Sequence, residues 1–223
     1  MGEVSGGRLV AKALKAEGVK YVFSLPGRHI SPIYEGLIDE GIEIVSVRHE
    51  QAAGNAADGW GRVTRTPGVC LVTAGPGVTN MFPALVQAYH AGSPVIAITG
   101  RSPFALLDKY GFQEIDTIAL VSSVAKWARS CSMVYRIPEY VQDAFRAALT
   151  GKMGPAVLDI PLDTLCLTCE GSKVPMIPPE RCRSAGRVYG DPVLVKRAAE
   201  MLLSAEKPII FAGSGVYWAD ASE

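Results

Sequence analysis

Glu50 is the side chain of this sequence best placed to do chemistry. It follows the apolar run 42–47, which is typical of a strand covered on both faces of a parallel sheet, and it opens a helix of small residues over 51–60. Open α/β sheets bind ligands at the carboxyl ends of their strands, and a helix start favours a negative charge. Glu50 is therefore a candidate catalytic residue, although these residues alone favour a role that only caps its helix.

Two glycine-rich turns could belong to a dinucleotide-binding site. They are Gly75-Pro76-Gly77 and Gly213-Ser214-Gly215, and both follow predicted strands. Neither has the Gly or Ala that helix–strand packing requires at the sixth position, and no acidic residue is well placed to bind a ribose. The sequence also lacks a phosphate-loop lysine motif. We therefore do not expect an NAD-binding fold.

The five cysteines favour a reducing compartment, because their number is odd and Cys70 and Cys131 lie in apolar segments. We accordingly expect a cytoplasmic protein. Cys166, Cys169 and Cys182 could together supply three thiolate ligands. A structural zinc site needs four ligands and no histidine is close in sequence, so we predict no metal site in this chain.

The composition is that of an ordinary soluble protein, with 223 residues, 48% of them hydrophobic, and 22 basic against 22 acidic side chains. A net charge of zero argues against nucleic acid or an anionic membrane as the main partner. No apolar run approaches the ~20 residues of a membrane span, and the N-terminus lacks the pattern of a secretory signal. The remaining class of partner is a small-molecule substrate or another protein chain.

Strands and helices are predicted to alternate along the first 165 residues, with short Gly and Pro turns between them. This order predicts a doubly wound α/β fold, with a mostly parallel sheet and helices on both faces. The long irregular segment 102–116 leaves the carboxyl edge, where long loops usually carry function. Expected strands cover 21–25, 42–47, 69–73, 94–99, 127–135 and 156–161; expected helices cover 8–17, 31–39, 50–60, 78–91, 118–126 and 138–150.

Beyond residue 162 the pattern breaks, and prolines, cysteines and charges follow one another without a period. We interpret 166–190 as a linker between domains. Asp191-Pro192 then caps a helix to about Ser204, and 207–213 is predicted to be a strand, so a second α/β domain begins over 191–223. One helix and one strand cannot bury a core, and we therefore expect the chain to be a piece or one part of a split protein.

Seven short motifs occur in order, and together they resemble one family. Over 7–165 the chain is similar to the N-terminal, pyrimidine-binding domain of thiamine diphosphate enzymes of the acetolactate synthase type. The tail from Asp191 resembles the opening of that family's central domain. The motifs are Ser24-Leu25-Pro26-Gly27, Arg48-His49-Glu50-Gln51-Ala52, Gly59-Trp60-Gly61-Arg62, Thr73-Ala74-Gly75-Pro76-Gly77-Val78-Thr79-Asn80, Ile98-Thr99-Gly100, Gly111-Phe112-Gln113-Glu114 and Gly154-Pro155-Ala156-Val157-Leu158-Asp159-Ile160-Pro161.

The resemblance gives Glu50 a role. In the family, a glutamate at this position hydrogen-bonds the cofactor's aminopyrimidine ring and so promotes loss of the thiazolium C2 proton. It also implies that small or amide side chains line the ring. Ordinary turn chemistry would explain the prolines and glycines equally well, and the amide could instead cap its helix. The implied cofactor-binding residues are Pro26, Gly27, Glu50, Thr73, Pro76 and Asn80.

Two further catalytic candidates follow from the resemblance. His29 in Gly27-Arg28-His29-Ile30 looks like the histidine that faces the substrate in benzaldehyde lyase, 2-hydroxyacyl-CoA lyase-like and cyclohexane-dione hydrolase members. An imidazole moves protons near neutral pH, although this one could also be a surface histidine. Gln113 resembles the family's substrate-side glutamine, or is simply an exposed loop residue. The implied activity forms or cleaves C–C bonds in 2-oxo acids, 2-hydroxy ketones or acyl-CoA substrates.

The family holds the cofactor's diphosphate through Mg²⁺ in a domain marked by Gly-Asp-Gly, a motif that this sequence does not contain. The resemblance therefore implies that this chain supplies only the pyrimidine half of a site. The other half would come from a neighbouring subunit, in a homodimer or homotetramer or from a separate chain. Some relatives also hold FAD in the central domain. A non-catalytic dimerisation module is the alternative function.

Overall fold

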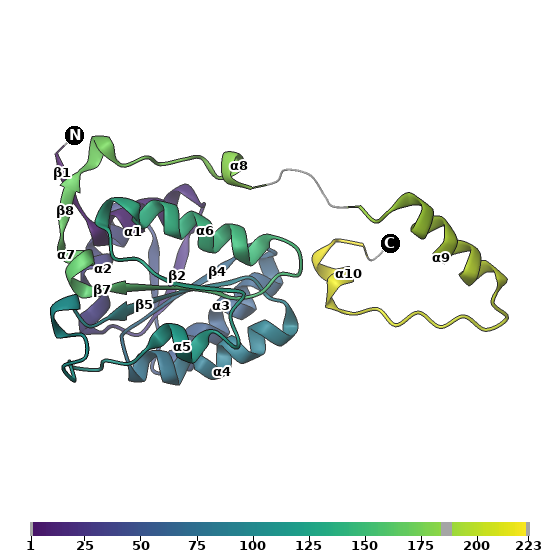
Figure 1. Ribbon diagram of the computed structural model, residues 1–223, viewed down its shortest axis with the longest axis horizontal. Helices are drawn as coiled ribbons and strands as arrows, with labels where there is room; N and C mark the ends of the chain where they lie inside the picture. Colours follow the sequence, from purple (N-terminus) through teal and green to yellow (C-terminus); the bar gives the residue numbers. More distant parts are fainter. Residues whose placement is uncertain (1, 184–188, 222–223) are drawn as a thin grey trace.

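Six strands form one parallel sheet in the computed structural model, which describes residues 2–183 and 189–221 (Figure 1). Their order across the sheet is β3-β2-β4-β5-β7-β6, and every neighbouring pair runs in parallel. The predicted doubly wound α/β fold is thereby confirmed. The strands are β2 (Tyr21–Ser24), β3 (Glu43–Ser46), β4 (Gly68–Val72), β5 (Val95–Arg101), β6 (Trp127–Ser130) and β7 (Ala156–Pro161).

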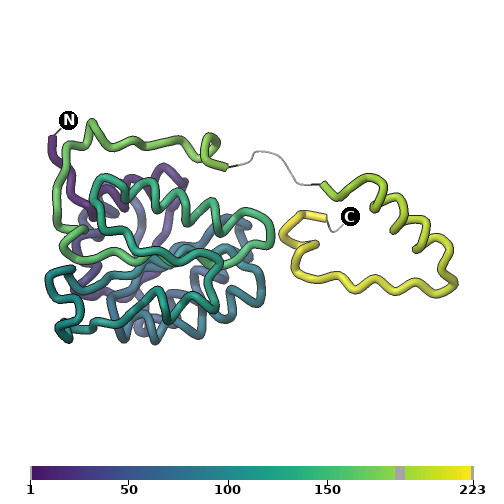
Figure 2. Tube along the Cα trace, in the orientation of Figure 1, coloured from purple at the N-terminus to yellow at the C-terminus, as the bar shows by residue number. Residues whose placement is uncertain are grey.

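Helices cover both faces of this sheet and bury two apolar clusters (Figures 1 and 2). One face packs on α1 (Gly6–Ala16), α2 (Ser31–Asp39) and α6 (Ile137–Leu149); the other packs on α3 (Glu50–Thr64), α4 (Pro76–Ala91) and α5 (Thr117–Val121). Side chains alternate along each strand, so Leu71 belongs to the first cluster and Cys70 to the second. The central strands β4 and β7 are buried throughout, as parallel strands covered on both faces must be.

The expectation that 42–47 is covered on both faces is wrong. This segment forms β3, which lies at the edge of the sheet and pairs only with β2 among the described residues. Glu43 and Ser46 are exposed, and Ile44 and Val45 are half-buried. An edge strand has a neighbour on one side only, so β-branched residues there reflect strand propensity as well as burial.

Several element ends differ from the prediction. Ser31 does not cap α2 but is its first residue, and its hydroxyl donates to the carbonyl of Arg28. The expected strand 127–135 stops at Ser130, and the expected helix 118–126 is the five-residue α5. Pro32 lies in the first turn of α2, as predicted, where its missing N–H costs nothing.

Part of the segment predicted as a linker folds back on the domain. After α7 (Leu162–Cys166), β8 (Thr168–Glu170) pairs antiparallel with β1 (Glu3–Ser5), and the two lie side by side in Figure 2. Farther along, the segment includes η4 (Gly171–Lys173) and α8 (Pro179–Cys182); Gln142 donates to the carbonyl of Ile177, and Arg183 pairs with the buried carboxylate of Glu17. The boundaries 1–165, 166–190 and 191–223 stay a prediction.

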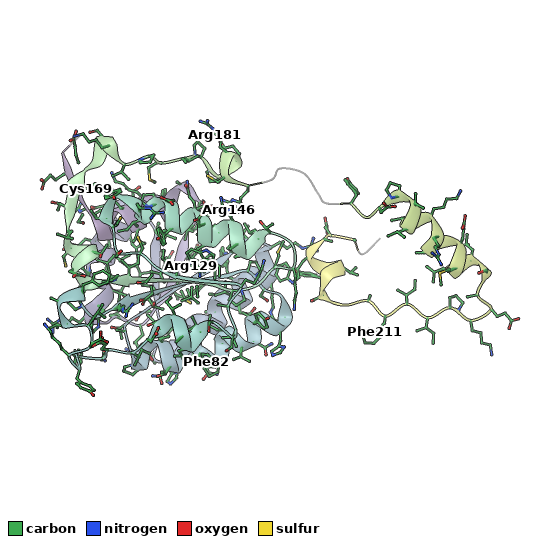
Figure 3. The ribbon with its side chains drawn as sticks, in the orientation of Figure 1. Phe82, Arg129, Arg146, Cys169, Arg181 and Phe211 are labelled. Atoms are coloured by element: carbon green, nitrogen blue, oxygen red, sulfur yellow. The ribbon has the colours of Figure 1, made fainter. Side chains whose placement is uncertain are left out.

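The tail contains α9 (Pro192–Ser204). Asp191 caps the N-terminus of this helix, as predicted, because its side chain accepts hydrogen bonds from two backbone N–H groups. The strand predicted over 207–213 is wrong, since this segment is extended but unpaired. Ile209 and Phe211 are 90% and 100% exposed, and the Phe211 side chain stands out from the chain in Figure 3. A strand needs a neighbour for its N–H and C=O groups, and the described tail offers none. After it, α10 (Ser214–Trp218) contacts the ends of α3 and α4 through Tyr217 and Trp218.

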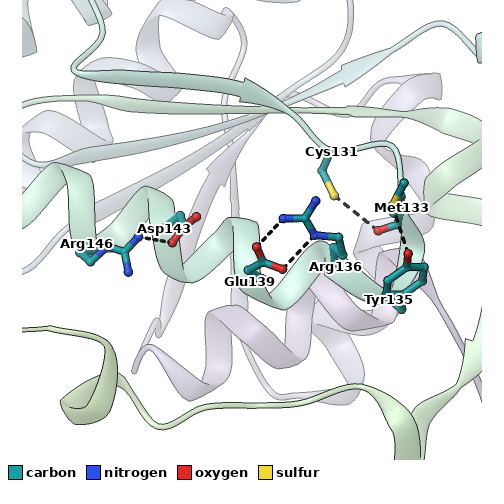
Figure 4. A network of polar contacts seen from close by, with 7 residues as sticks. All are labelled: Cys131, Met133, Tyr135, Arg136, Glu139, Asp143 and Arg146. Carbon is teal, nitrogen blue, oxygen red and sulfur yellow. Dashed lines mark hydrogen bonds and ion pairs between the residues drawn. The ribbon is translucent and has the colours of Figure 1, made fainter.

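All five cysteines are free thiols. Cys70 and Cys131 are buried as predicted, and burial raises the pKa of their thiols to about 12 and about 11. Cys131 donates to the carbonyl of Met133 at the turn into α6, beside the surface pairs Arg136–Glu139 and Asp143–Arg146 (Figure 4). No helix in the described ranges combines the length and apolar character needed to cross a membrane.

Candidate functional site

The strand order reverses between β2 and β4. The chain leaves β2 toward β3 on one side, and leaves β4 toward β5 on the other. In open α/β sheets such a reversal opens a crevice outside the carboxyl ends of the two strands. The loops that leave β2 and β4 there carry Pro26, Gly27, Thr73 and Pro76. Of these four, Gly27 and Thr73 are in contact, whereas both prolines are exposed.

Glu50 lies at the start of α3 and only 8% of its surface is exposed. The interpretation that it merely caps the helix is wrong: His49 is the N-cap residue, and its Nδ1 accepts from the N–H of Gln51 at 3.2 Å. The Glu50 side chain instead turns toward α4, where Oε2 accepts from Nδ2 of Asn80 at 3.0 Å. As the first residue of α3, Glu50 also places its negative charge at the favourable end of the helix dipole.

Asn80 is the fifth residue of α4, whose N-cap is Gly75, so the alternative that Asn80 caps this helix is wrong as well. Its amide reaches Glu50 because α3 and α4 pack unusually closely. A Cβ on Gly54 of α3 would lie 2.5 Å from the Cβ of Ala84 on α4, closer than real Cβ atoms approach. The small residues of α3 therefore bring the carboxylate and the amide together.

Two glycines pack tightly against Thr73 beside the carboxylate. A Cβ on Gly77 would lie 2.9 Å from Cγ2 of Thr73 and 3.7 Å from Oε1 of Glu50. A Cβ on Gly27 would lie 2.4 Å from the Cβ of Thr73. Because Gly27 has an extended backbone with φ −157°, close approach and not turn conformation requires glycine there.

His29 is buried, with 2% of its surface exposed, so the alternative of a surface histidine is wrong. Its Nδ1 lies 3.1 Å from Oγ1 of Thr73, and its ring stacks on Phe112 with centroids 6.0 Å apart. Burial lowers the pKa of His29 below its ordinary value; the Arg28 guanidinium adds to this, and a hydrogen bond with the Phe112 backbone opposes it. The imidazole is consequently neutral at pH 7.

Gln113 is half-buried on the segment 102–116, with φ +60°. Its carbonyl oxygen lies 2.6 Å from where a Cβ on Gly75 would be, which ties the segment to the start of α4. Ser102 donates to the Phe112 carbonyl at 2.9 Å, and Glu114 accepts from two backbone N–H groups of the same segment. The loop is thus closed on itself and carries Phe112 and Gln113 as one unit.

Sequence reasoning missed two residues beside this site, Phe112 and Asp159. Phe112 covers His29, and an aromatic residue next to Gln113 on a long loop was the available signal. Asp159 is 0% exposed in β7, where it accepts from Oγ1 of Thr99 at 2.8 Å. Its signal was one carboxylate inside the apolar run 156–160. Desolvation raises its pKa to about 6, opposed by Thr99 and the charge of Arg101.

Residues 4–120 match the family model described as "Thiamine pyrophosphate enzyme, N-terminal TPP binding domain". The chain belongs to the thiamine pyrophosphate enzymes. Thiamine pyrophosphate is another name for thiamine diphosphate, so the resemblance drawn from the seven motifs is confirmed. The match reaches from β1 into α5 and includes Glu50, Asn80, His29 and Gln113.

Within this family, the chain is similar to curated acetolactate synthase large subunits. The chain is 39% identical over 223 residues to a "Probable acetolactate synthase large subunit" of Methanocaldococcus jannaschii, covering 99% of this chain and 37% of the relative. It is 38% identical over 215 residues to an acetolactate synthase large subunit of Mycobacterium tuberculosis, covering 96% and 39%. It is 35% identical over 218 residues to the acetolactate synthase isozyme 2 large subunit of Escherichia coli, covering 98% and 39%. The chain therefore spans well under half the length of these relatives.

Proposed function

We propose that this domain supplies the pyrimidine half of a thiamine diphosphate site in an enzyme that forms or cleaves C–C bonds next to a carbonyl. The observation that carries the proposal is the buried carboxylate of Glu50, held at the sheet's carboxyl edge by the amide of Asn80. A buried acid fixed in this way can share a proton with a ring nitrogen of a bound ligand. The family match and the acetolactate synthase-like relatives support the same reading.

The residues fit the cofactor. Gly27 and Gly77 let the chain after β2 and after β4 close on Thr73 beside Oε1 of Glu50, so this edge of the proposed site is made of backbone and small side chains, which a flat ring can approach. We propose that Gly27, Thr73 and Asn80 hold the aminopyrimidine with Glu50, and that Pro26 and Pro76 border it from the two loops. When bound, thiamine diphosphate supplies a carbanion at its thiazolium C2 that adds to a carbonyl carbon.

We assign the substrate side to His29 and Gln113. His29 is neutral at pH 7, and its hydrogen bonds with Thr73 and the Phe112 backbone orient its ring, which can exchange a proton with a substrate oxygen once that oxygen replaces one of these partners. Gln113 offers an amide that can hydrogen-bond the same molecule. We propose a 2-oxo acid, a 2-hydroxy ketone or an acyl-CoA as the substrate class, with acetolactate synthase-like chemistry.

The diphosphate and its Mg²⁺ need protein outside these 223 residues. Within the described ranges, no group of three or more His, Cys, Asp or Glu side chains could hold a metal ion. We propose that this half-site is completed in a homodimer or homotetramer, or by a chain that carries the diphosphate-binding domain. The five free thiols fit our proposal of a cytoplasmic protein. FAD remains an expectation from the resemblance, and the visible absorption spectrum of the whole protein tests it.

The decisive test is Glu50→Gln in the whole enzyme. The amide keeps the shape of the carboxylate but cannot share its proton, so we expect kcat to fall by about 10²–10⁴. The control is Glu35→Gln on α2, whose side chain is 79% exposed and pairs only loosely with Arg8 at 3.8 Å. Circular dichroism and Tm of both variants should match the parent. Near-normal turnover by Glu50→Gln would refute the assigned role.

Calorimetry of the 223-residue chain tests the half-site proposal. With thiamine diphosphate and Mg²⁺ present, we expect weak binding and no turnover, because the diphosphate lacks its partners. Tight, stoichiometric binding would contradict the idea that other protein completes the site.

The competing function is a non-catalytic dimerisation module. Gly59 of α3 has nothing within 4 Å of its missing Cβ, and Ala52 and Asn55 on the same helix are exposed, so this face suits close helix packing in either case. A continuing reading frame or an adjacent gene that encodes Gly-Asp-Gly favours the enzyme. Dimers without any thiamine-dependent activity in the assembled protein favour the module.

A further inference from the structure

The segment 102–116 is held to the rest of the domain at two places. At its far arm, Phe112 stacks on His29 and Gln113 packs against Gly75. At its base, the segment meets Asp163 of α7, and Arg101, the last residue of β5 and the one directly before the segment, meets Asp159 of β7. The base has no residue in the proposed site, yet any shift of it moves the arm, because Ser102 is bonded to the Phe112 carbonyl.

Asp159 holds the base through Arg101. The register of the sheet sets Thr99, Asp159 and Ser130 side by side on three strands. Thr99 donates to one carboxylate oxygen at 2.8 Å, and Nη1 of Arg101 lies 3.8 Å from the other. Oδ2 of Asp159 and Nε of Arg101 are buried without a hydrogen-bond partner in the described residues. The hydrogen bond from Thr99 and the charge of Arg101 thus offset part of the cost of burying the Asp159 carboxylate, and Arg101 is the partner that links Asp159 to the base of the segment.

Asp163 holds the base through the backbone. Its Oδ2 accepts from the N–H of Phe104 at 3.0 Å, and its Oδ1 accepts from the N–H of Thr164 at 3.0 Å. The carboxylate thus bridges the start of α7 to the short helix η2 (Phe104–Leu106) within the segment. Hydrogen bonds to a charged acceptor are stronger and shorter than neutral ones, so this single contact constrains the chain direction after β5.

We propose that Asp159 and Asp163 are positioning residues that fix the base of the segment 102–116 and thereby hold Phe112 and Gln113 against the site. Neither acid touches the proposed substrate or cofactor. The inference deepens the proposed function, and its kinetic consequence rests on that function, whereas its structural consequence does not.

The structural consequence is tested on the 223-residue chain by limited trypsin digestion at Lys109, an exposed residue of the segment. The fragment that begins at Tyr110 is followed by mass spectrometry. We expect Asp163→Asn and Arg101→Gln each to speed its release about tenfold, which corresponds to about 1.4 kcal/mol. Asp159→Asn should do the same, and the other two variants carry the test if it fails to fold.

The matched control is Asp143→Asn on α6, which breaks a surface pair with Arg146 at 2.6 Å away from the segment (Figure 4). Its cleavage at Lys109 should equal that of the parent chain. Equal cleavage in Asp163→Asn, Arg101→Gln and the control would overturn the proposal, whatever the activity of the enzyme.

The kinetic consequence is tested in the whole enzyme with Asp163→Asn. We expect KM for the substrate to rise about tenfold while the affinity for thiamine diphosphate stays unchanged, because Glu50 and Asn80 belong to other elements. Faster Lys109 cleavage with an unchanged KM would overturn the positioning role. A parent enzyme without thiamine-dependent turnover would overturn the proposed function and leave the digestion result standing.

Discussion

Nδ2 of Asn80 donates a hydrogen bond to Oε2 of Glu50 over 3.0 Å, across thirty residues of chain and between two helices. The amide has two donor hydrogens and the carboxylate has two acceptor oxygens, so the bond uses only part of each group. It orients the carboxylate before any ligand arrives. Preorganisation of this kind lowers the cost of binding, since the protein group need not be immobilised at that moment.

Asn80→Ala should therefore weaken cofactor binding without abolishing the reaction. A hydrogen bond to a charged group contributes about 1.5–3 kcal/mol, and we expect the Kd of thiamine diphosphate in the whole enzyme to rise at least tenfold. The measurement is a cofactor titration of turnover. Thr79→Ala is the control from the same turn, because among the described residues its hydroxyl bonds only the Pro76 carbonyl. Equal cofactor affinity in Asn80→Ala and the parent would remove Asn80 from the site.

Phe112 should control the pKa of His29. Burial holds that pKa below 6.5, so Phe112→Ala, which opens the ring to water, should raise it toward the ordinary value. The chain has three histidines, and His29→Asn identifies the resonance that belongs to His29 in an NMR titration.

The sign of the stability effect follows from the same shift. A histidine whose pKa is lowered by folding contributes stability above pH 6.5 that is lost as the pH falls through its folded pKa. As the pH falls below 6.5, the free energy of unfolding of His29→Asn should therefore decrease less than that of the parent. A His29 resonance that titrates at the same pH in Phe112→Ala and the parent would contradict the covering role of Phe112.

Two glycines of α3 should respond oppositely to alanine. In Gly54→Ala the new methyl would meet Ala84 at 2.5 Å, and overpacking of this kind costs about 1–3 kcal/mol. Gly59→Ala meets nothing within 4 Å and should be neutral or stabilise by up to about 1 kcal/mol, since alanine is the better helix former. Urea unfolding of the 223-residue chain measures both. Equal stability of the two variants would show that α3 and α4 tolerate a wider spacing.

Asp159 should make the domain more stable at moderately acid pH. Its pKa is raised from 3.8 to about 6 by desolvation, so the folded state binds its proton more tightly than the unfolded state does. The stabilisation is complete below 3.8 and is lost as the pH rises through about 6. The gap corresponds to on the order of 3 kcal/mol at 1.36 kcal/mol per pH unit.

Urea unfolding of the parent and of Asp159→Asn at pH 4 and pH 7 isolates this contribution, since the other titrating groups cancel. We expect the free energy of unfolding of the parent, relative to that of Asp159→Asn, to be higher at pH 4 than at pH 7. A difference between the two that stays the same at both pH values would show that Asp159 does not titrate in this window.

The sequence predicted what depends on local pattern and could not predict what depends on neighbours. Glu50 was identified because the end of a strand and the start of a helix can be recognised from the local sequence pattern. The resemblance named Asn80 as well, but the hydrogen bond between the two could not be predicted, since it depends on how closely Gly54 lets two helices approach.

The same division explains the errors in the fold. The residues of β3 read as a central strand because propensity is local, whereas the position of a strand within the sheet is set by pairing. The segment 207–213 has the apolar composition of a strand, but it has no neighbouring strand to pair with in the described chain. Asp159 was not identified, because the role of a single acid inside a buried strand depends on its contacts with Thr99 and Arg101, which the local sequence does not reveal.

The pairing of β1 with β8 has a consequence for the order in which the domain is made. Glu3 faces Glu170 in the register, so β1 leaves the ribosome well before its partner β8, which lies more than 160 residues further along the chain. Contacts between such distant positions form late and slowly. The start of α1, whose N-cap is Ser5 of β1, is therefore completed only after all six strands of the parallel sheet have been synthesised.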